Sequence, residues 1–582
     1  MEQEKEKRKQ ITREESEQEK WVHDGSVDFK GRVPLRASTG VWKASLFVLT
    51  IEFSERVSYF GIAANLISYL TKVIHEDLKT AAKNVNYWTG TTTLMPLIGG
   101  FVADAYTGRF PLVLFSSLVY LMQGLSLLTM SQYIPNLKAC NRKICPKPKK
   151  LHEVVFFLAL YCISLGTGGH KPCLESFGAD QFDEDHVLER KKKMSFFNWW
   201  NVALCFALLF GATVIVYVQD FVSWGAASLI LTILMALSII AFYVGNPFYR
   251  YRRAQGNPLK PILQVLVAAI RKRNLSCPSN PDLLYEVTKD KFQGRLLCNT
   301  SRLRFLDKAS IIEDTHVDQK ENPWRLSTVT RVEETKLIIN IIPIWLTSLT
   351  TGICVAQGST LFVKQAASMN LKLSDNFTIP PASVSSAAAF GTIICVPIYD
   401  KIIVPFMRKV TGNERGISIL RRISIGLTFS IILMIVAALI EAKRLKMQKS
   451  MSVFWLVPQY LILGFGDAFS LVGLQEYFYD QVPDSMRSLG MALYLSVIGV
   501  GSFLSSFLIT IVDHVTKKNG KSWIGKDINS SRLDKFYWML AVINALNLCV
   551  YIFLAKRYTY KSVHLTNNEI DGSKSGGEEM MP

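Results

Sequence analysis

The sequence predicts an all-α membrane protein with twelve transmembrane helices in two six-helix bundles. Of the 582 residues, 49% are hydrophobic, and they gather into repeated apolar runs of about 20 residues, the length that crosses a hydrocarbon core. Charged residues lie mostly in the gaps between these runs and at both ends of the chain. The polar stretch 246–332 separates six runs from six more, which is the layout of membrane proteins built from two helical repeats.

We expect every run to be helical, because lipid offers no hydrogen-bond partner to an open backbone. The runs of the first half lie near 43–71, 85–104, 111–133, 153–171, 196–218 and 222–245. The runs of the second half lie near 335–360, 379–400, 419–441, 453–478, 488–512 and 535–555. The chain thus divides into a cytoplasmic N-terminal tail (1–42), an N-terminal bundle (43–245), a cytoplasmic linker (246–332), a C-terminal bundle (333–557) and a cytoplasmic C-terminal tail (558–582). Residues 1–40 are polar and mixed in charge, so we expect them to be disordered.

The distribution of charge sets the orientation. The chain carries 66 Lys and Arg against 47 Asp and Glu, a formal net charge of +19. The basic residues are scattered over the loops rather than gathered in one module, which argues against nucleic-acid binding. Cytoplasmic loops of membrane proteins collect Lys and Arg, and the linker, the run 190–193 and the loop 401–422 are basic if the N-terminus lies inside. The loops 443–446 and 517–526, which then fall outside, are basic too.

Three features of the loops bear on this topology. The stretch 258–273 is amphipathic and ends in Arg-Lys-Arg, so it either lies along the inner membrane surface or packs on the bundles as an ordinary linker helix. The sequons at Asn376 and Asn529 fall outside, where they are open to glycosylation. Cys140 and Cys145 share an outside loop, in which a disulfide and two free thiols are both compatible with the sequence.

The first run carries three ionisable residues in its middle, Glu52, Glu55 and Arg56. Each would cost roughly 2.5–3.5 kcal/mol at the bilayer centre. Together with Tyr59 they are spaced i, i+3, i+4 and i+7, so they share one helical face that must point into a cavity. A carboxylate beside a fixed guanidinium, in a site that opens and closes to water, is suited to binding and releasing a proton. The alternative is a static ion pair that locks helices together.

Other runs carry ionisable residues as well. Lys171 ends the fourth run, and Asp467 lies in the tenth with Glu476 beyond it. We expect Lys171 and Asp467 to pair across a central cavity and to separate as it opens; the alternative is that Lys171 snorkels to an interface. Glu476 either lines the cavity or is solvated at a helix end, and His170 is interpreted as a helix-end residue.

The loop after the second run contains Asp104 and Arg109 among several glycines. Glycines allow close helix contact, and the two charged side chains can form a cytoplasmic latch between helices. We interpret this pair as a gating element, with a static ion pair as the alternative.

Enzyme motifs are lacking from the sequence. No HExxH, GxSxG or Walker pattern accompanies the runs, and the glycine-rich stretch 166–169 lacks the strand–turn–helix context of a nucleotide loop. We therefore predict neither an enzyme nor an ATP-driven pump, and no cofactor other than a proton as the coupling ion.

A set of short segments recurs in order along nearly the whole chain. They are Glu52-x-x-Glu55-Arg56 with Tyr59 and Gly61, Asp104-x-x-x-Gly108-Arg109, Gly-Ala-Asp-Gln-Phe-Asp at 178–183, Phe-Phe-Asn-Trp-Trp at 196–200, Arg-Phe-Leu-Asp-Lys-Ala at 304–309 and Pro-Gln-Tyr at 458–460. With these segments the chain resembles the proton-coupled oligopeptide transporter family, and more narrowly its plant nitrate/peptide transporter branch. The long linker is also typical of the plant branch.

The resemblance implies a major facilitator fold that works by alternating access. It implies by position that Glu52, Glu55 and Arg56 couple protons, and that Lys171 contributes to the cavity and pairs with the tenth helix. The family usually has Glu at the position of Asp467, so the shorter side chain in this sequence has less reach.

The resemblance leaves the substrate open, because family members carry nitrate, di- and tripeptides, hormones or glucosinolates. A seventh-helix histidine that binds nitrate in one relative aligns with Val355 here, close to Gln357. Nitrate is not excluded, since Arg56 and Lys171 are cationic, and Tyr59 suits a peptide backbone or a larger organic anion. We assign Tyr59, Lys171, Gln357, Asp467 and Glu476 to the substrate cavity.

The sequence thus predicts a proton-coupled symporter of a small polar or anionic solute, such as nitrate, a di- or tripeptide or an organic anion. The alternatives are a proton-independent facilitator or exporter on the same fold, and a solute sensor that signals through the linker. The predicted partners are the solute and membrane lipid, with a kinase acting on cytoplasmic segments as a further candidate. The plasma membrane and the vacuolar membrane both fit the sequence.

Overall fold

The computed structural model describes residues 20–558 apart from 23, 135–136, 138–147, 184–185, 253–255, 258, 279, 281–282, 287–296, 313–321, 376, 413–415, 448–450, 484–486 and 519–521. Within these residues, ten helical segments are long and apolar enough to cross a membrane. We call each such segment a rod. Two further long helices, α2 (Val41–Lys72) and α3 (Leu78–Val102), bring the number of rods within the described residues to the twelve that the sequence predicts. Cys140, Cys145 and Asn376, for which the sequence suggests a disulfide and a glycosylation site, lie outside the described residues.

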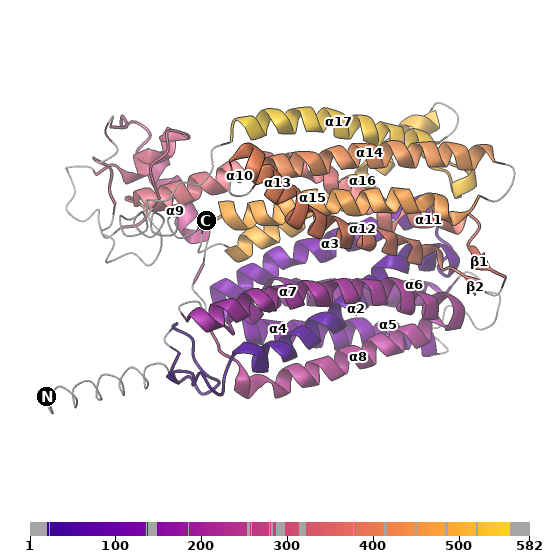
Figure 1. The fold of residues 1–582 in the computed structure, drawn as a ribbon, viewed down its shortest axis with the longest axis horizontal. Helices are drawn as coiled ribbons and strands as arrows, with labels where there is room; N and C mark the ends of the chain where they lie inside the picture. The colour runs from indigo at the N-terminus through magenta and orange to yellow at the C-terminus, as the bar shows by residue number, and fades with distance from the viewer. Residues whose placement is uncertain are drawn as a thin grey trace, which may run out of the picture.

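The first half of the chain forms the N-bundle, drawn in indigo to magenta in Figure 1. Its rods are α2 (Val41–Lys72); α3 (Leu78–Val102) with η1 (Ala103–Thr107); α4 (Arg109–Val119), η2 (Tyr120–Leu125) and α5 (Ser126–Tyr133); α6 (Lys150–Ala179); α7 (Val187–Phe210) with η3 (Gly211–Ile215) and η4 (Val218–Val222); and α8 (Trp224–Val244). The segments η1 to η4 are π-helical turns, which interrupt the regular ladder and bend the rods.

The second half forms the C-bundle, drawn in orange to yellow. Its rods are α10 (Val329–Ser359) with α11 (Leu361–Ala367); η10 (Pro381–Ser385), α12 (Ser386–Ile398), η11 (Tyr399–Ile403) and α13 (Val404–Thr411); α14 (Ile419–Lys446); η12 (Val453–Leu456) with α15 (Val457–Gln481); α16 (Arg487–Lys518); and α17 (Leu533–Lys556). Strands β1 (Lys372–Ser374) and β2 (Phe377–Thr378) form a short antiparallel hairpin in the loop after α11.

The rods of both bundles run side by side, so the molecule has two distinct ends (Figure 1). Linker helix α9 lies beyond one end, which we call the linker end, and β1 and β2 lie beyond the opposite end, which we call the hairpin end. The linker end corresponds to the side that the sequence predicts to be cytoplasmic.

The linker helix α9 (Leu259–Arg271) is amphipathic, as the sequence predicts. Its buried face, which includes Val265 and Ala268, packs with Leu306 of the 3-10 segment η8 (Arg304–Ser310) and with Val332 at the start of α10. This packing agrees with the alternative of a linker helix packed on the bundles, and a position of α9 along the inner membrane surface stays a prediction.

The segment before α2 is ordered over most of the residues that the structure describes, which differs from the expected disordered tail. Val22 donates a backbone hydrogen bond of 3.0 Å to Pro34, and Val27 pairs with Tyr251 beyond the end of α8. The physical reason is that charged residues of this segment meet opposite charges on the N-bundle, as the site geometry below shows.

The two bundles touch along α3, α16 and α10. A Cβ atom added at Gly499 of α16 would lie 2.8 Å from Thr93 Oγ1 of α3, and one added at Gly501 would lie 2.5 Å from the Cα atom of Gly352 in α10. Such contacts bring helix backbones close together. Gly499 therefore lies at the crossing between the bundles, while Gly501 packs two helices of the C-bundle against each other.

Polar contacts join the bundles near the hairpin end. Lys79 at the start of α3 donates a 2.7 Å hydrogen bond to Asp513 of α16, and the backbone N–H of Leu78 donates one of 2.9 Å to the carbonyl of Lys526. Lys364 of α11 donates a hydrogen bond of 2.9 Å to Thr71 of α2. These contacts hold the hairpin ends of the bundles together in this conformation.

Candidate functional site

Three charged side chains lie buried in the middle of α2. Glu52, Glu55 and Arg56 are 3%, 0% and 2% exposed. Arg56 pairs with the Glu55 carboxylate, and its Nε atom lies 3.5 Å from Glu52 Oε1. Glu55 also accepts a hydrogen bond of 3.3 Å from Thr167 of α6. Glu52 is bound less firmly, because its Oε2 atom is buried without a hydrogen-bond partner.

Tyr59 continues this charged face by one turn. The Arg56 guanidinium lies 5.2 Å from the centre of the Tyr59 ring, a cation–π distance. The ring also stacks on Trp88 of α3 at 5.7 Å between centroids, and Trp88 is fixed by a hydrogen bond of 2.9 Å from its Nε1 atom to the carbonyl of Leu160. The i, i+3, i+4 and i+7 residues of the first run therefore share one face, as the sequence predicts.

The glycine-rich stretch 166–169 has a packing role in α6. A Cβ at Gly166 would lie 2.6 Å from the Tyr120 Cβ atom, and one at Gly168 would lie 2.7 Å from the Met95 Cβ atom. A Cβ at Gly169 would lie 2.9 Å from the Cβ atom of Ser116. These contacts let α6 approach the third rod and α3 closely, while Thr167 faces Glu55 on α2.

His170 and Lys171 lie inside α6, which continues to Ala179 instead of ending at Lys171. Beyond Lys171 the helix buries Pro172, Cys173, Leu174, Phe177 and Gly178, but Lys171, Glu175 and Ser176 interrupt the apolar run, so a search for such runs ends too early. His170 is completely buried, so its interpretation as a helix-end residue is wrong. Lys171 is partly buried and lies one helical turn before Glu175 on the same face.

Asp467 lies on α15, within the C-bundle. It lines a small cavity of about 10 Å³ together with Thr351, Cys354, Val355 and Ser430, a volume near the smallest that holds a water molecule. Within the part of the chain that the structure describes, neither Asp467 nor Lys171 makes an ion pair. The predicted pair between them is therefore not formed in this conformation.

Gln357 and Glu476 also lie apart from the α2 cluster. Gln357 Nε2 donates a 3.0 Å hydrogen bond to Ser505 of α16, and Ser505 accepts another of 3.2 Å from Asn86 of α3. Gln357 thus belongs to the contact between the bundles. Glu476 lies 3.3 Å from Arg422 of α14 in a partly exposed ion pair at the linker end.

The latch residues lie at the linker end of the N-bundle. Arg109 Nε is 3.7 Å from Asp104 Oδ1, and the same guanidinium pairs closely with Asp180 at the end of α6. Asp180 in turn lies 3.4 Å from Arg252, which pairs with Asp24 of the N-terminal segment at 3.4 Å. The predicted latch is therefore part of a longer charge network, and all of it lies on the N-bundle side of the linker.

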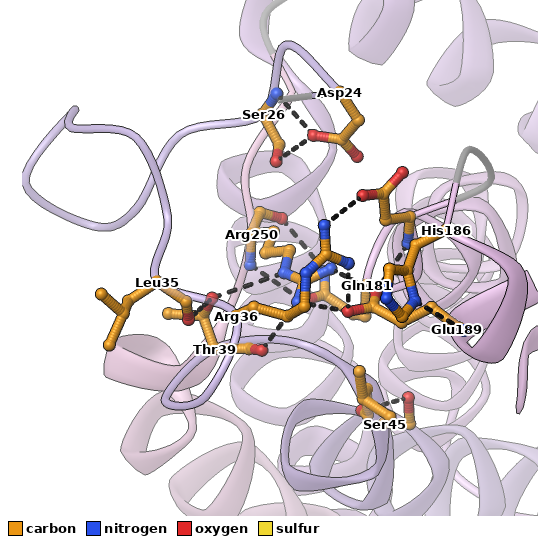
Figure 2. Close-up of polar contacts among 12 residues, drawn as sticks. Asp24, Ser26, Leu35, Arg36, Thr39, Ser45, Gln181, His186, Glu189 and Arg250 are labelled. Carbon is orange, nitrogen blue, oxygen red and sulfur yellow. Dashed lines mark hydrogen bonds and ion pairs between the residues drawn. The ribbon is translucent and has the colours of Figure 1, made fainter. Parts of the chain in front are cut away.

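A second charged cluster beside this network, which we call the N-terminal clamp, consists of Arg36, Asp183, Glu189 and Arg250; Figure 2 labels Arg36, Glu189 and Arg250. Arg250 is 0% exposed and donates to Glu189 at 2.7 Å and 3.3 Å and to the Thr39 carbonyl at 3.0 Å. Arg36 donates to Asp183 and to Glu189, each at 2.8 Å. The clamp fastens the N-terminal segment to the start of α7 and to the chain after α8.

Comparison with known proteins places this geometry in a family. The family model described as POT family matches residues 110–525. The chain belongs to the POT family. Members of this family are transporters, so the chain is a multi-pass membrane transporter and not an enzyme, and its fold is the major facilitator fold.

Curated relatives show to which branch of the POT family this transporter belongs. It is 60% identical over 554 residues to Protein NRT1/ PTR FAMILY 5.6 of Arabidopsis thaliana, covering 94% of this chain and 96% of the relative. It is 58% identical over 561 residues to Protein NRT1/ PTR FAMILY 5.7 of the same plant, covering 94% of this chain and 93% of the relative. The plant branch inferred from the sequence motifs is confirmed.

Solved structures agree in fold with the POT family transporter. The crystal structure of an auto-inhibited POT family peptide transporter has a TM-score of 0.66 at 18% identity, covering 90% of this chain and 99% of that one. A POT family transporter in complex with 5-aminolevulinic acid has a TM-score of 0.60 at 13% identity, covering 88% of this chain and 96% of that one.

Sequence reasoning missed two sets of residues in this transporter. Asp180 and Asp183 were quoted as part of a signature but given no role, and their ion pairs depend on the tertiary fold. Arg36 and Arg250 were assigned to a tail and a linker, where charge usually means solvent exposure. The burial of Arg250 carries no signal in the local sequence, since its partner Glu189 lies far away along the chain.

Proposed function

We propose that this transporter is a proton-coupled symporter of a small polar or anionic solute that works by alternating access. The observation that carries this proposal is the buried cluster of Glu52, Glu55 and Arg56 on α2. Two carboxylates and one guanidinium leave a net charge of −1 in the protein interior, where an unbalanced charge is costly. One bound proton makes the cluster neutral, so the cluster is suited to take up and release a single proton.

Glu52 is the better of the two proton acceptors. Glu55 is fixed by its ion pair with Arg56 and by the hydrogen bond from Thr167. Glu52 lies 3.5 Å from Arg56, beyond hydrogen-bond distance, and has one oxygen without a partner. Protonation of Glu52 thus removes the less compensated charge and leaves the Arg56 pair with Glu55 intact.

The solute is proposed to bind between the bundles near Tyr59 and Lys171. Lys171 is a cation without an ion-pair partner among the described residues, and a basic side chain beside the site favours solutes with a carboxylate or another anionic group. Nitrate, small peptides and organic anions share this feature. The residues near Lys171 do not discriminate among these three classes.

The exchange of access is proposed to occur by rocking of the bundles at the crossing of α3 and α16, where Gly499 lies. Opening at the hairpin end requires the Lys79–Asp513 pair to break, and these side chains are 30% and 19% exposed. Ion pairs with such exposure contribute about 0–1 kcal/mol. The contacts that hold this conformation are therefore weak enough to break and form again in each cycle.

Solute-evoked current in voltage-clamped oocytes tests this proposal. Nitrate, a dipeptide mixture and a panel of organic anions are offered at mildly acidic and mildly alkaline external pH. We expect an inward current that is larger at low pH and is lost in Glu52→Gln and Glu55→Gln, while Asp375→Asn in the exposed hairpin loop retains it. Tracer flux that persists after the proton gradient is collapsed would instead identify a facilitator, and solute binding without flux would identify a sensor.

A further inference from the structure

His170 is buried in α6 beside the charged cluster of α2. It is 0% exposed, and both of its ring nitrogens are buried without a hydrogen-bond partner. One ring nitrogen of His170 and one oxygen from each of Glu52 and Glu55 lie within 4.8 Å of one another. A buried imidazole with neither nitrogen satisfied is unusual, because nearly all buried polar groups are hydrogen-bonded.

The cluster contains a matching unsatisfied acceptor. Glu52 Oε2 is also buried without a partner. A neutral imidazole carries one N–H donor and one acceptor nitrogen, whereas a protonated imidazole carries two N–H donors. A neutral His170 can therefore donate one hydrogen bond to Glu52 Oε2 after a side-chain rotation that closes the remaining distance, and protonation turns its second ring nitrogen into a donor as well.

The α2 cluster brings a net negative charge close to His170. On α2 it faces Glu52, Glu55 and Arg56, whose charges add up to −1. The other titratable groups nearby are Tyr59 of α2 and Tyr120 of η2, which both interact with Glu55 and Arg56, and Lys171 and Glu175 on α6 itself, whose opposite charges cancel. α3 packs on α6 through Met95, Gly99 and the glycine stretch and brings no charge to this position.

We propose that His170 is a second proton-binding group of this transporter and shares the transported proton with Glu52. The proposal rests on the proposed proton-coupled function. In the transfer, the O–H bond of a protonated Glu52 breaks and an N–H bond forms at the free ring nitrogen of His170. Glu52 becomes a carboxylate that accepts a hydrogen bond from the imidazolium. For release, the N–H bond breaks and the proton returns to Glu52, whose O–H bond then breaks as a water molecule accepts the proton. No oxidant or other reactant takes part.

Glu52, Glu55 and His170 also have the spacing of a metal site. A metal ion, however, would change the net charge of the cluster differently from a proton. The Arg56 guanidinium pairs with Glu55 and lies 3.5 Å from Glu52, so a cation already stands where a metal ion would bind. A proton adds one charge to the cluster and makes it neutral, whereas a divalent ion would leave it with a net charge of +1. Proton binding is therefore the better match.

The first measurement is a pH titration of the purified full-length transporter by infrared difference spectroscopy with isotope-labelled histidine, which needs no solute. We expect a histidine signal that is lost in both His170→Gln and His170→Asn and retained in His514→Gln, whose histidine is exposed at the hairpin end of α16. In Glu52→Gln the midpoint of the His170 signal should shift by about one pH unit or more. Thermal unfolding of each variant verifies that it is folded.

The second measurement is the pH profile of uptake in the same variants. We expect the pH of half-maximal uptake to shift by about one unit in His170→Gln and to stay unchanged in His514→Gln. Proton-dependent uptake with an unchanged profile, and no histidine signal lost in His170→Gln, would overturn the role of His170 and leave the proposed function standing. If His170 titrates but the rate of uptake does not depend on pH, proton coupling is refuted, and with it the sharing of a transported proton. If Zn²⁺ raises the Tm of the native protein and does not raise that of His170→Gln, the group is a metal site and the proposal of a proton site is overturned.

Discussion

Removal of one charge from the N-terminal clamp should destabilise the N-bundle strongly. In Glu189→Gln the guanidinium of Arg250, which is 0% exposed, loses the partner to which it donates at 2.7 Å and 3.3 Å. The acceptors that remain are neutral, namely the amide oxygen at position 189 and the two oxygens of Thr39. Breaking a buried ion pair on one side costs about 3–5 kcal/mol, because the other charge stays buried and unpaired.

The apparent Tm of purified protein measures this cost. A change of 1 kcal/mol shifts the Tm by about 2–4 °C in a unit the size of one bundle, so we expect a decrease of about 6 °C or more. The double variant Glu189→Leu with Arg250→Met should regain part of this loss, because replacing both partners of a buried pair by apolar groups is close to neutral, while Arg36 still loses its ion pair with Glu189. Arg32→Gln, which removes an ion pair whose arginine is 68% exposed, is the control and should change the Tm by less than about 2 °C. A decrease no larger than in this control, or a double variant less stable than the single one, would refute the assignment.

Three further predictions test other parts of the molecule. Burial raises the pKa of Glu76, in the loop between α2 and α3, from 4.5 to about 7. The folded state then binds this proton more tightly than the unfolded state does. The contribution of Glu76 to the free energy of unfolding is therefore complete below pH 4.5 and is lost as the pH rises to 7. Glu76→Gln should therefore match the native Tm at pH 4.5 and exceed it at pH 8, and an equal Tm at both pH values would contradict this. A Cβ at Gly499 would press on α3 at 2.8 Å, while one at Gly466 has its nearest neighbour at 3.4 Å, so Gly499→Ala should slow solute uptake and Gly466→Ala should not. Asn529 lies at the hairpin end, and expression in a glycosylating host should give a glycan there that Asn529→Gln removes; glycosylation of the linker instead would reverse the topology.

The fold was predictable because it depends on local properties of the chain. An apolar run of sufficient length must form a helix in lipid, whatever its neighbours are. The end of an apolar run does not mark the end of a helix that continues through the protein interior. For this reason α6 extends to Ala179 although the apolar run ends near Lys171, and the burial of His170 could not be predicted from the run.

The site was predictable to the extent that it lies on one helix. The spacing of Glu52, Glu55 and Arg56 fixes their common face on α2, and the structure brings them together. The pair between Lys171 and Asp467 requires a particular arrangement of two bundles, which a sequence cannot specify for one conformation. Its absence here leaves the pair a prediction for another conformation of the transport cycle.

The composition of the N-terminal clamp has a consequence for the order of events during synthesis. Its last member along the chain is Arg250, and the latch network beside it is complete at Arg252. Every group that fastens the N-terminal segment has therefore left the ribosome before the first residue of the C-bundle is made. The N-bundle can close its own linker end, with its buried charges paired, while the second half of the transporter is still being translated.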